Sequence, residues 1–502
     1  MTANPWERDA PSSPPGRPAA DPLSPPPGCP AHGLSADALG PGPVGPGGLR
    51  RLFGPEAESD PMRLYETLRA RHGSVAPVLL HGDLPAWLVL GHRENLEVVR
   101  TPTVFSRDSR HWSDMQRGRV PADHPLAPIT AWQPLCVFAD GAEHERLRGA
   151  VTDSLGRFES RGIRRHVTRF TNQLVDEFAA TGRADLVDQF AAQLPLRVMT
   201  QLFGMPDDYG PALVEAVQDV LNGTETAPAS NDYITKTLQQ LVERKRVTPG
   251  HDFPSKLIEH EARLNDAEIR EHLRLILTAA NETTVNLIAN ALRMVLTDPR
   301  FRANLAGGHM TLPDALEQVM WDEPPMMTLL GRWATSDTQL GEQTIHAGDL
   351  VLLGLGAGNV DPAIRPDLKA PVSGNRSHLA FSGGPHECPG QHLGRAIADT
   401  AIDTVLTRLP DLRLAVQKEE LSWSASLMYR HLESLPVKFT PRGGAARSSE
   451  SGSGRATATV GRAELPSLQP QPQPAPHAPA QAPGDSGARG SWWKSRSRRT
   501  GS

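Results

Sequence analysis

The chain has 502 residues, of which 38% are hydrophobic, and a formal net charge of −5. This length is ample for a large core, and the charge is too mild to indicate a nucleic-acid partner. The three cysteines, Cys29, Cys136 and Cys388, are too sparse for a disulfide framework and suit a reducing cytoplasm. The sequence shows neither an apolar signal-peptide core nor a run of about 18 apolar residues, so we expect no signal peptide and no membrane anchor.

Proline is concentrated at the two ends of the chain, together with Gly, Ser, Ala and Gln. Such segments cannot bury enough apolar surface to offset the entropy of ordering. We therefore expect residues 1–48 and 443–502 to be disordered and residues 49–442 to form the globular part. The last residues include Trp492 and Trp493 followed by Lys and Arg, which suits either an acidic or membrane partner or a solvated tail.

The first clear element of the globular part is a short strand at residues 86–90. Trp112, Trp132 and the segment 224–230 follow, and each suits either substrate contact or ordinary packing. His144 and Arg148 are four residues apart in DGAEHERLRGAV, so a helix places both on one face. A solvated charged helix would show the same spacing.

Apolar residues at helical spacing predict a long helix over residues 266–297. Ala279, Glu282 and Thr283 lie in its middle. An acid and an alcohol side by side on an apolar helix are costly to bury without a purpose. A threonine hydroxyl also tends to bond the carbonyl four residues earlier. A polar stripe on a half-exposed helix is the alternative interpretation.

Residues 345–356 read as strand and turn, because a Gly-Asp pair precedes VLLGL. With most other segments helical, the predicted fold class is mainly α with a small β region. A helix over residues 391–406 follows the glycine-rich loop 381–390, whose sequence is FSGGPHECPG. We expect Pro389 at the first helical position and Cys388 at the helix N-terminus, where the dipole lowers a thiol pKa. Gly383 and Gly384 are expected to adopt positive φ.

The loop resembles the haem-ligand loop of the cytochrome P450 family, soluble bacterial or actinobacterial type. Its defining positions are filled by Phe381, Gly384, His386, Cys388 and Gly390. The resemblance covers about residues 50–440 and implies the cytochrome P450 fold, a haem b cofactor and Cys388 as the iron ligand. A thiolate ligand favours O–O cleavage.

The same resemblance extends to the long helix and to the basic residues. It implies that Ala279 adjoins the haem, that Thr283 steadies bound dioxygen and that Glu282 supplies protons, with Ala280 in place of the usual glycine. The cationic groups that it implies for the haem propionates are His144, Arg148, Arg332 and His386.

One departure from the family lies in residues 315–325, where the Glu-x-x-Arg motif is altered. Gln318 and Trp321 occupy the Glu and Arg positions. Because replacing both partners of a buried ion pair is often nearly neutral, we hypothesise that Trp321 fills the volume and donates its indole N–H to Gln318. The family's next arginine, Arg365 or Arg376 here, would then lack its Glu.

The function that the resemblance implies is a cytoplasmic monooxygenase that inserts one oxygen atom from O2 into a small organic substrate. Electrons would come from ferredoxin and ferredoxin reductase, with NAD(P)H as their source. Two alternatives stay open. One is a peroxide-driven peroxygenase, against which the Glu282–Thr283 pair argues. The other is a non-enzymatic haem-binding sensor or partner protein, suggested by the altered motif and the unusual tails.

Overall fold

A computed structural model describes residues 43–442 except 122–123, 207–208, 223–225, 371 and 373. The two expected disordered segments fall almost wholly outside these residues. Residues 43–48 are described, and they form a β-bridge between Val44 and Arg50 and a 3-10 turn over Pro46–Gly48. The expectation of disorder for residues 1–42 and 443–502 stays a prediction.

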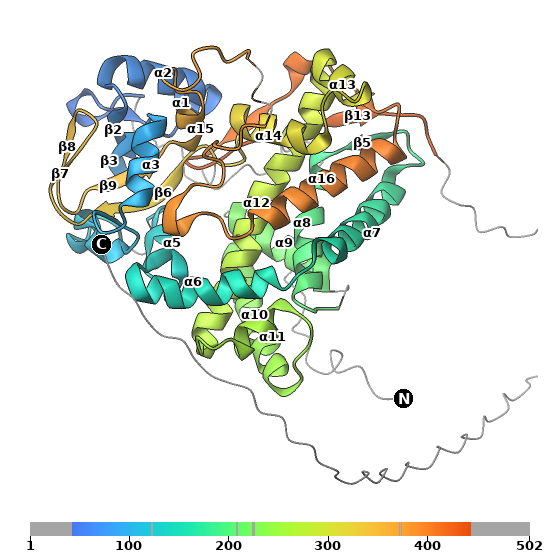
Figure 1. Cartoon of the computed structure of the whole chain (residues 1–502), viewed down its shortest axis with the longest axis horizontal. Helices are drawn as coiled ribbons and strands as arrows, with labels where there is room; N and C mark the ends of the chain where they lie inside the picture. Colours follow the sequence, from blue (N-terminus) through green and yellow to red (C-terminus); the bar gives the residue numbers. More distant parts are fainter. Residues whose placement is uncertain are drawn as a thin grey trace, which may run out of the picture. The chain divides into compact units, whose positions relative to one another are not determined.

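A mixed sheet with the strand order β1-β2-β3-β9-β6-β4 lies toward one side of the described residues (Figure 1). β2 and β3 pair antiparallel, with Val75 opposite Val89, and β3 runs parallel to β9. The smaller sheets have the orders β10-β13-β5, β11-β12 and β7-β8. The strands are β1 Arg50–Arg51, β2 Val75–Leu80, β3 Leu84–Val89, β4 Phe105–Ser106, β5 Arg183–Asp185, β6 Leu329–Ala334, β7 Thr338–Leu340, β8 Gln343–Ile345, β9 Leu350–Leu353, β10 Arg413–Leu414, β11 Trp423–Ala425, β12 Arg430–Leu432 and β13 Pro436–Lys438.

Helices make up most of the rest, which confirms the predicted fold class. No helix among the described residues is both long and apolar enough to span a bilayer. The α-helices are α1 Pro55–Ser59, α2 Pro61–His72, α3 His92–Arg100, α4 Ser113–Gln116, α5 Ala127–Thr130, α6 Gly141–Gly156, α7 Ser160–Phe178, α8 Leu194–Leu202, α9 Tyr209–Asn222, α10 Ala227–Val247, α11 Phe253–Glu259, α12 Asp266–Thr297, α13 Pro299–Ala306, α14 Leu312–Asp322, α15 Leu355–Asn359 and α16 Gln391–Arg408.

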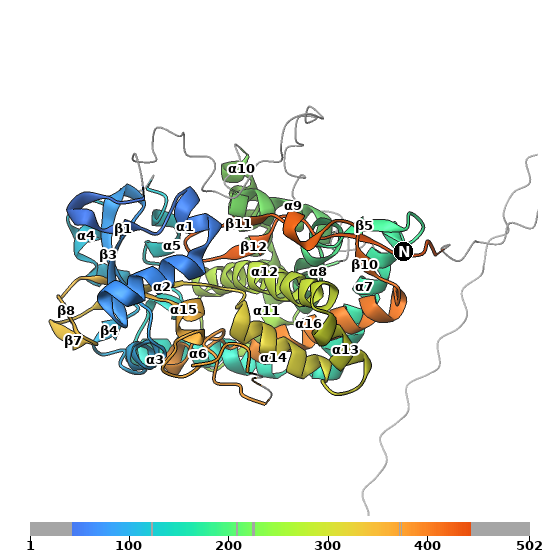
Figure 2. The ribbon, with the colours of Figure 1, turned by 90° about the horizontal axis from the view of Figure 1, so that it is seen from above.

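The central helix α12 has the bounds that the apolar spacing predicts. It begins with a capping box: Asn265 accepts from the Glu268 N–H at 2.9 Å, and Glu268 accepts from the Asn265 N–H at 2.8 Å. In Figure 2 α12 runs between β11 and β12 on one side and α14 and α16 on the other. The predicted strand at 86–90 is β3, and the predicted helix at 391–406 is α16.

Candidate functional site

The cysteine loop folds back on itself before α16 begins. The backbone N–H of Cys388 donates to the carbonyl of Phe381 at 3.0 Å, and Glu387 donates to Gly384 at 3.0 Å. α16 starts at Gln391 with Gly390 as its N-cap, so Pro389 lies in a turn and not at the first helical position as we expected. Cys388 therefore stands two residues before the N-cap.

Two residues of this loop have left-handed backbone conformations. They are Ser382, with φ +58°, and Gly384, with φ +67°. Gly383 has φ −171°, which is ordinary extended backbone, so the expectation of positive φ holds for Gly384 and is wrong for Gly383. A Cβ on Gly384 would overlap the carbonyl oxygen of Val99 in α3, which explains why only glycine fits there.

The thiol of Cys388 is not the activated group that its position suggested. Burial raises the pKa of Cys388, and this outweighs the backbone N–H of Gly390 and the charge of Arg148, which both lower it. The expected influence of the helix end is present but weaker than desolvation.

A buried carboxylate links the two flanks of the cysteine loop. Glu317 of α14 is 4% exposed, and its Oε2 lies 2.9 Å from Nε2 of His378, which is ten residues before Cys388. Its Oε1 accepts from Nε of Arg395, seven residues after Cys388 in α16, at 2.7 Å. The guanidinium of Arg395 also lies over the ring of Phe381, 4.4 Å from its centroid. One side chain thus holds the segment before the loop and the helix after it.

The hypothesis about Trp321 is right in part. Trp321 is 1% exposed and fills volume as expected. Its indole N–H donates to the carbonyl of Asn375 at 2.9 Å and not to Gln318. Gln318 instead donates to Asp322 at 2.6 Å. The indole prefers the carbonyl because Gln318 lies on the partly exposed side of α14, where its amide reaches other partners.

Both arginines that were expected to lack their Glu have acidic neighbours. Arg365 lies 2.9 Å from Asp322 and over the ring of Trp321. Arg376 is 67% exposed on its side chain and lies 3.9 Å from Glu317. Arg365 is therefore pinned to the end of α14 by an acid that the sequence reading did not consider.

Two buried arginines lie together near the start of β6. Arg332 is 2% exposed, and its Nη2 has no hydrogen-bond partner among the described residues. Arg107 donates to the carbonyls of Leu330 and Val137 at 2.8 Å. Burial lowers the pKa of Arg332 well below its usual value, and the charge of Arg107 adds to this, while Asp140 opposes it. The pair is an excess of buried positive charge that an anion would relieve.

The predicted residues of α6 face the same region. The rings of His144 and His386 lie 4.0 Å apart, and His386 Nε2 is 3.4 Å from Asp140 Oδ1. Arg148 donates to the carbonyl of Glu387, beside the cysteine. His144, Arg148 and His386 are thus brought together with the loop.

Burial disfavours a positive charge on either histidine, which counts against the expectation that His386 is a cation. Burial first, and then Arg332, Arg107 and His144, lower the pKa of His386 to about 3. Burial and Arg148 lower the pKa of His144. Each imidazole still offers one N–H as a donor, and the permanent charge comes from the arginines.

Ala279 and Thr283 mark open space beside α12. Ala279 is exposed although it lies in the middle of a helix that other elements surround. Thr283 donates its hydroxyl to the Ala279 carbonyl at 2.8 Å, as expected for a threonine in a helix. Burial raises the pKa of Glu282, and the one charged neighbour acting on it is His431, 3.5 Å away.

The candidate substrate contacts from the sequence, Trp112, Trp132 and the segment 224–230, have different surroundings in the structure. Trp112 is fully buried, 6.4 Å from the ring of Trp333, so it belongs to the core. Trp132 is 43% exposed beneath the guanidinium of Arg110. The segment 224–230 lies partly outside the described residues.

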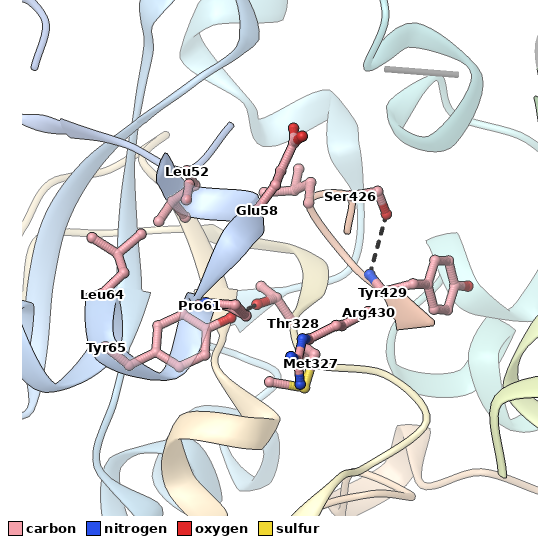
Figure 3. Close-up of a pocket in the computed structure, with 12 residues that line it drawn as sticks. Leu52, Glu58, Pro61, Leu64, Tyr65, Met327, Thr328, Ser426, Tyr429 and Arg430 are labelled. Atoms are coloured by element: carbon pink, nitrogen blue, oxygen red, sulfur yellow. Dashed lines mark hydrogen bonds between the residues drawn. The ribbon is translucent and has the colours of Figure 1, made fainter. Parts of the chain in front are cut away.

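A small pocket lies between α2, the start of β6 and the β11–β12 hairpin (Figure 3). Tyr65 and Thr328 line it and share a hydrogen bond of 3.2 Å between their oxygens. Its volume of about 20 Å³ is room for about one water molecule, not for an organic substrate.

The residues present fit a haem. An unpartnered buried guanidinium nitrogen on Arg332 and the unpartnered Nε2 of His144 suit carboxylate groups. Cys388 offers a sulfur ligand, and Ala279 leaves space beside α12. Sequence reasoning missed Arg107, Glu317, His378, Arg395 and His431 as parts of this region. Each of them acts through a tertiary contact that no local motif records.

No protein-family model matches the chain. Named proteins do match it. A 2-hydroxy-5-methyl-1-naphthoate 7-hydroxylase from Streptomyces carzinostaticus is 30% identical over 393 residues, which are 76% of this chain and 96% of that protein. Cytochrome P450-SU2 from Streptomyces griseolus is 32% identical, and the match covers 74% of this chain and 92% of that protein.

Solved structures agree with the sequence comparison. CYP154A1 from Streptomyces coelicolor A3(2) has a TM-score of 0.68 and 30% identity, covering 76% of this chain and 98% of that one. CYP154C4 from Streptomyces sp. W2061 has a TM-score of 0.69 and 29% identity, covering 76% of this chain and 96% of that one. The cytochrome P450 monooxygenase PikC from Streptomyces venezuelae is also 30% identical, and the match covers 77% of this chain and 93% of that protein. Relatives of this similarity, matched over almost their whole length, establish that the chain belongs to the cytochrome P450 family.

Proposed function

We propose that the protein is a haem-thiolate monooxygenase that inserts one oxygen atom from O2 into a small organic substrate. The observation that carries the proposal is the surroundings of Cys388. Cys388 offers a sulfur ligand, Arg107 and Arg332 are buried cations, and α12 is exposed at Ala279. These features occur together in a chain of the cytochrome P450 family. The named relatives include hydroxylases, so a non-enzymatic role is not favoured.

Haem b, when bound, supplies the redox centre at which dioxygen is reduced. Cys388 would hold the iron through its sulfur, and the Gly390 N–H would stabilise the sulfur's negative charge. Phe381 packs under the guanidinium of Arg395, which fixes the start of the loop. Gly384 allows the loop to pass directly over Val99.

The haem propionates would accept hydrogen bonds from buried donors of β6 and α6 that have no partner in the part of the chain that the structure describes. Arg332 would offer its unpartnered Nη2, Arg148 its guanidinium, and His144 and His386 one N–H each. Because Arg332 is buried without a paired acid in contact, an ionic partner there removes the cost of an isolated charge.

Glu282 and Thr283 would move protons on the open side of α12. Burial raises the pKa of Glu282, which favours the protonated carboxyl that a proton donor needs. The Thr283 hydroxyl donates to the Ala279 carbonyl, so to donate elsewhere it must leave that bond. A carboxyl followed by a hydroxyl makes a short proton path that admits little bulk water.

The electron source that we propose is ferredoxin with its reductase and NAD(P)H, and the location a cytoplasmic one, as the sparse cysteines suggest. The substrate is a small organic molecule.

The first test is a reduced carbon-monoxide difference spectrum of the purified holoprotein. Absorption near the wavelength that names the family is expected for the parent protein, and its loss in Cys388→Ser. A serine variant that keeps the parent's Soret band would show that the sulfur is not the ligand. Product formation with ferredoxin, reductase and NADPH, compared with hydrogen peroxide alone, then tests the use of O2.

A further inference from the structure

The β11–β12 hairpin brings a histidine against the acid of the central helix. β12 begins at Arg430 and packs on α12, with His431 paired opposite Ser424 of β11. His431 Nδ1 lies 3.5 Å from Glu282 Oε1. The side chains of His431 and Glu282 are 26% and 22% exposed, and the His431 Nδ1 atom that faces the carboxyl is itself buried.

The alternation of side chains along the hairpin explains why His431 faces α12. In Figure 3 Arg430 extends toward Met327, while the ring of Tyr429 points away from the pocket. Successive side chains in a strand point to opposite faces, so His431 shares the face of Tyr429. Burial raises the pKa of Tyr429, and the charge of Glu282 raises it further, which places Tyr429 close to the same carboxyl.

The other charged groups around the hairpin are engaged elsewhere. Arg430 and Arg293 both lie over the ring of Trp423. Their guanidinium carbons are 4.0 and 5.3 Å from the ring centroid, respectively. Arg293 is paired with Glu323, which together with Asp60 acts on Arg430. Among the described residues, His431 is the basic side chain whose charge acts on Glu282, and Tyr429 is a second titratable group beside the same carboxyl.

We propose that His431 is a positioning residue for the monooxygenase reaction, which holds the Glu282 carboxylate and returns a proton to it after each release. The inference rests on the proposed function, in which Glu282 supplies protons. In the transfer, the Nδ1–H bond of the imidazolium breaks and an O–H bond forms at Oε1. The neutral imidazole, which keeps its Nε2–H, then regains a proton at Nδ1 after a turn of the ring brings this buried nitrogen to solvent. No electron moves in this step.

The first measurement needs no haem activity. Infrared difference spectra of the haem-free protein across a pH series would follow the C=O stretch of protonated Glu282, identified by its loss in Glu282→Gln. His431→Gln is expected to raise the pKa of Glu282 by about one unit, since it removes an opposite charge. His431→Lys keeps that charge and should leave the pKa near the parent value. His346→Gln is the matched control, because His346 lies 3.4 Å from Asp337 in an exposed pair.

The second measurement uses the holoprotein with its redox partners. Both His431→Gln and His431→Lys are expected to lower product formation per electron, with kcat falling about tenfold and the solvent isotope effect rising, because neither side chain returns a proton readily near neutral pH. The carbon-monoxide spectrum and the substrate affinity should not change. His346→Gln should behave as the parent protein.

The outcomes separate the two proposals. If His431→Gln leaves both the Glu282 pKa and the coupling unchanged while Glu282→Gln lowers coupling, the role of His431 is overturned and the proposed function stands. If His431→Lys turns over as the parent does, the proton return is overturned and only a charge is needed. If Glu282→Gln keeps full coupling, the proton role of Glu282 itself fails.

Discussion

Arg332 illustrates how a single buried residue can favour ligand binding while it lowers the stability of the ligand-free protein. Its guanidinium is 2% exposed, has an unpartnered nitrogen and lies near a second buried cation, Arg107. A buried charge without a close partner destabilises a fold, and a bound anion removes that cost. In the role that we propose for it, the residue favours the haem-bound state over the haem-free one.

The prediction at this scale is that Arg332→Met stabilises the haem-free protein and weakens haem binding. We expect the free energy of unfolding without haem to rise by about 1–3 kcal/mol, because the methionine needs no counter-charge. Thermal unfolding of the haem-free protein and haem titration measure the two effects. Arg332→Lys keeps a charge but loses the planar guanidinium fork. Its haem affinity should therefore lie between those of the parent protein and Arg332→Met. A haem-free Arg332→Met protein that is less stable than the parent would contradict the argument.

Residues with a motif could be predicted from sequence, and residues that act by contact could not. Cys388 was found because its loop has a recognisable pattern, but the direction of its pKa was wrong, since burial depends on tertiary packing. Glu317 lies one residue before Gln318, outside the motif position that the sequence comparison points to. Its partners His378 and Arg395 are 61 and 78 residues away along the chain, and no local pattern connects them.

At the scale of elements, Glu317 joins α14, the segment before the cysteine loop and α16. Burial opposes its ionisation, but the hydrogen bonds from His378 and Arg395 outweigh burial and lower the pKa of Glu317 to about 2. This carboxylate does for the loop what the family's missing pair would do. We expect Glu317→Gln to lower the free energy of unfolding by about 3 kcal/mol, because Arg395 loses its counter-charge and the buried His378 loses a charged hydrogen-bond partner.

Urea unfolding measures the stability of Glu317→Gln. The carbon-monoxide spectrum measures the fraction of the protein in which thiolate ligation is intact. Both the stability and this fraction should fall. Glu143→Gln is a suitable control, because Glu143 is 55% exposed in a surface pair with Arg146. Unchanged stability and an unchanged spectrum in Glu317→Gln would show that the loop is held by other contacts.

The same carboxylate predicts a pH dependence. Its folded pKa of about 2 is below the ordinary value of 4.5, so its contribution to stability is fully present above about pH 5 and is lost as the pH falls toward 2. The shift corresponds to about 3 kcal/mol. Unfolding curves between pH 6 and pH 3, compared for the parent and Glu317→Gln, should converge as the pH falls, and curves that stay parallel would contradict the role of ionised Glu317.

Restoring the family motif on α14 is expected to harm the protein. The double change Gln318→Glu with Trp321→Arg removes a fully buried indole and its bond to Asn375, and it places a cation beside Arg365. We expect lower haem content and lower thermal stability than in the parent, measured on the purified proteins. A sharp rise in haem content from near zero would instead show that the native helix is defective.

The fold as a whole was largely predictable. α12 and α16 follow from apolar spacing, and β3 and the β8–β9 region from strand and turn signals. The cap of α16 differs, because Gly390 and not Cys388 ends the turn before the helix. Such boundaries depend on backbone hydrogen bonds of the folded loop, which residue types alone do not specify.

At the scale of the whole molecule, the relatives match about three quarters of this chain. The naphthoate hydroxylase is covered over 96% of its length by only 76% of this chain. Residues 443–502 lie outside the described residues, and their basic, tryptophan-containing end suits either a solvated tail or a contact with an anionic surface. About a quarter of this chain thus has no counterpart in that relative.

Deleting residues 443–502 is therefore expected to leave haem content, turnover and the carbon-monoxide spectrum unchanged. The fold of residues 43–442 contains every residue to which we assign a role at the haem. Sedimentation with anionic and with neutral vesicles, compared for the full and shortened chains, distinguishes the two interpretations of the tail. A solvated tail predicts no vesicle binding by either protein. Binding to anionic vesicles that disappears with the deletion and weakens with salt would instead establish the basic end as a membrane contact.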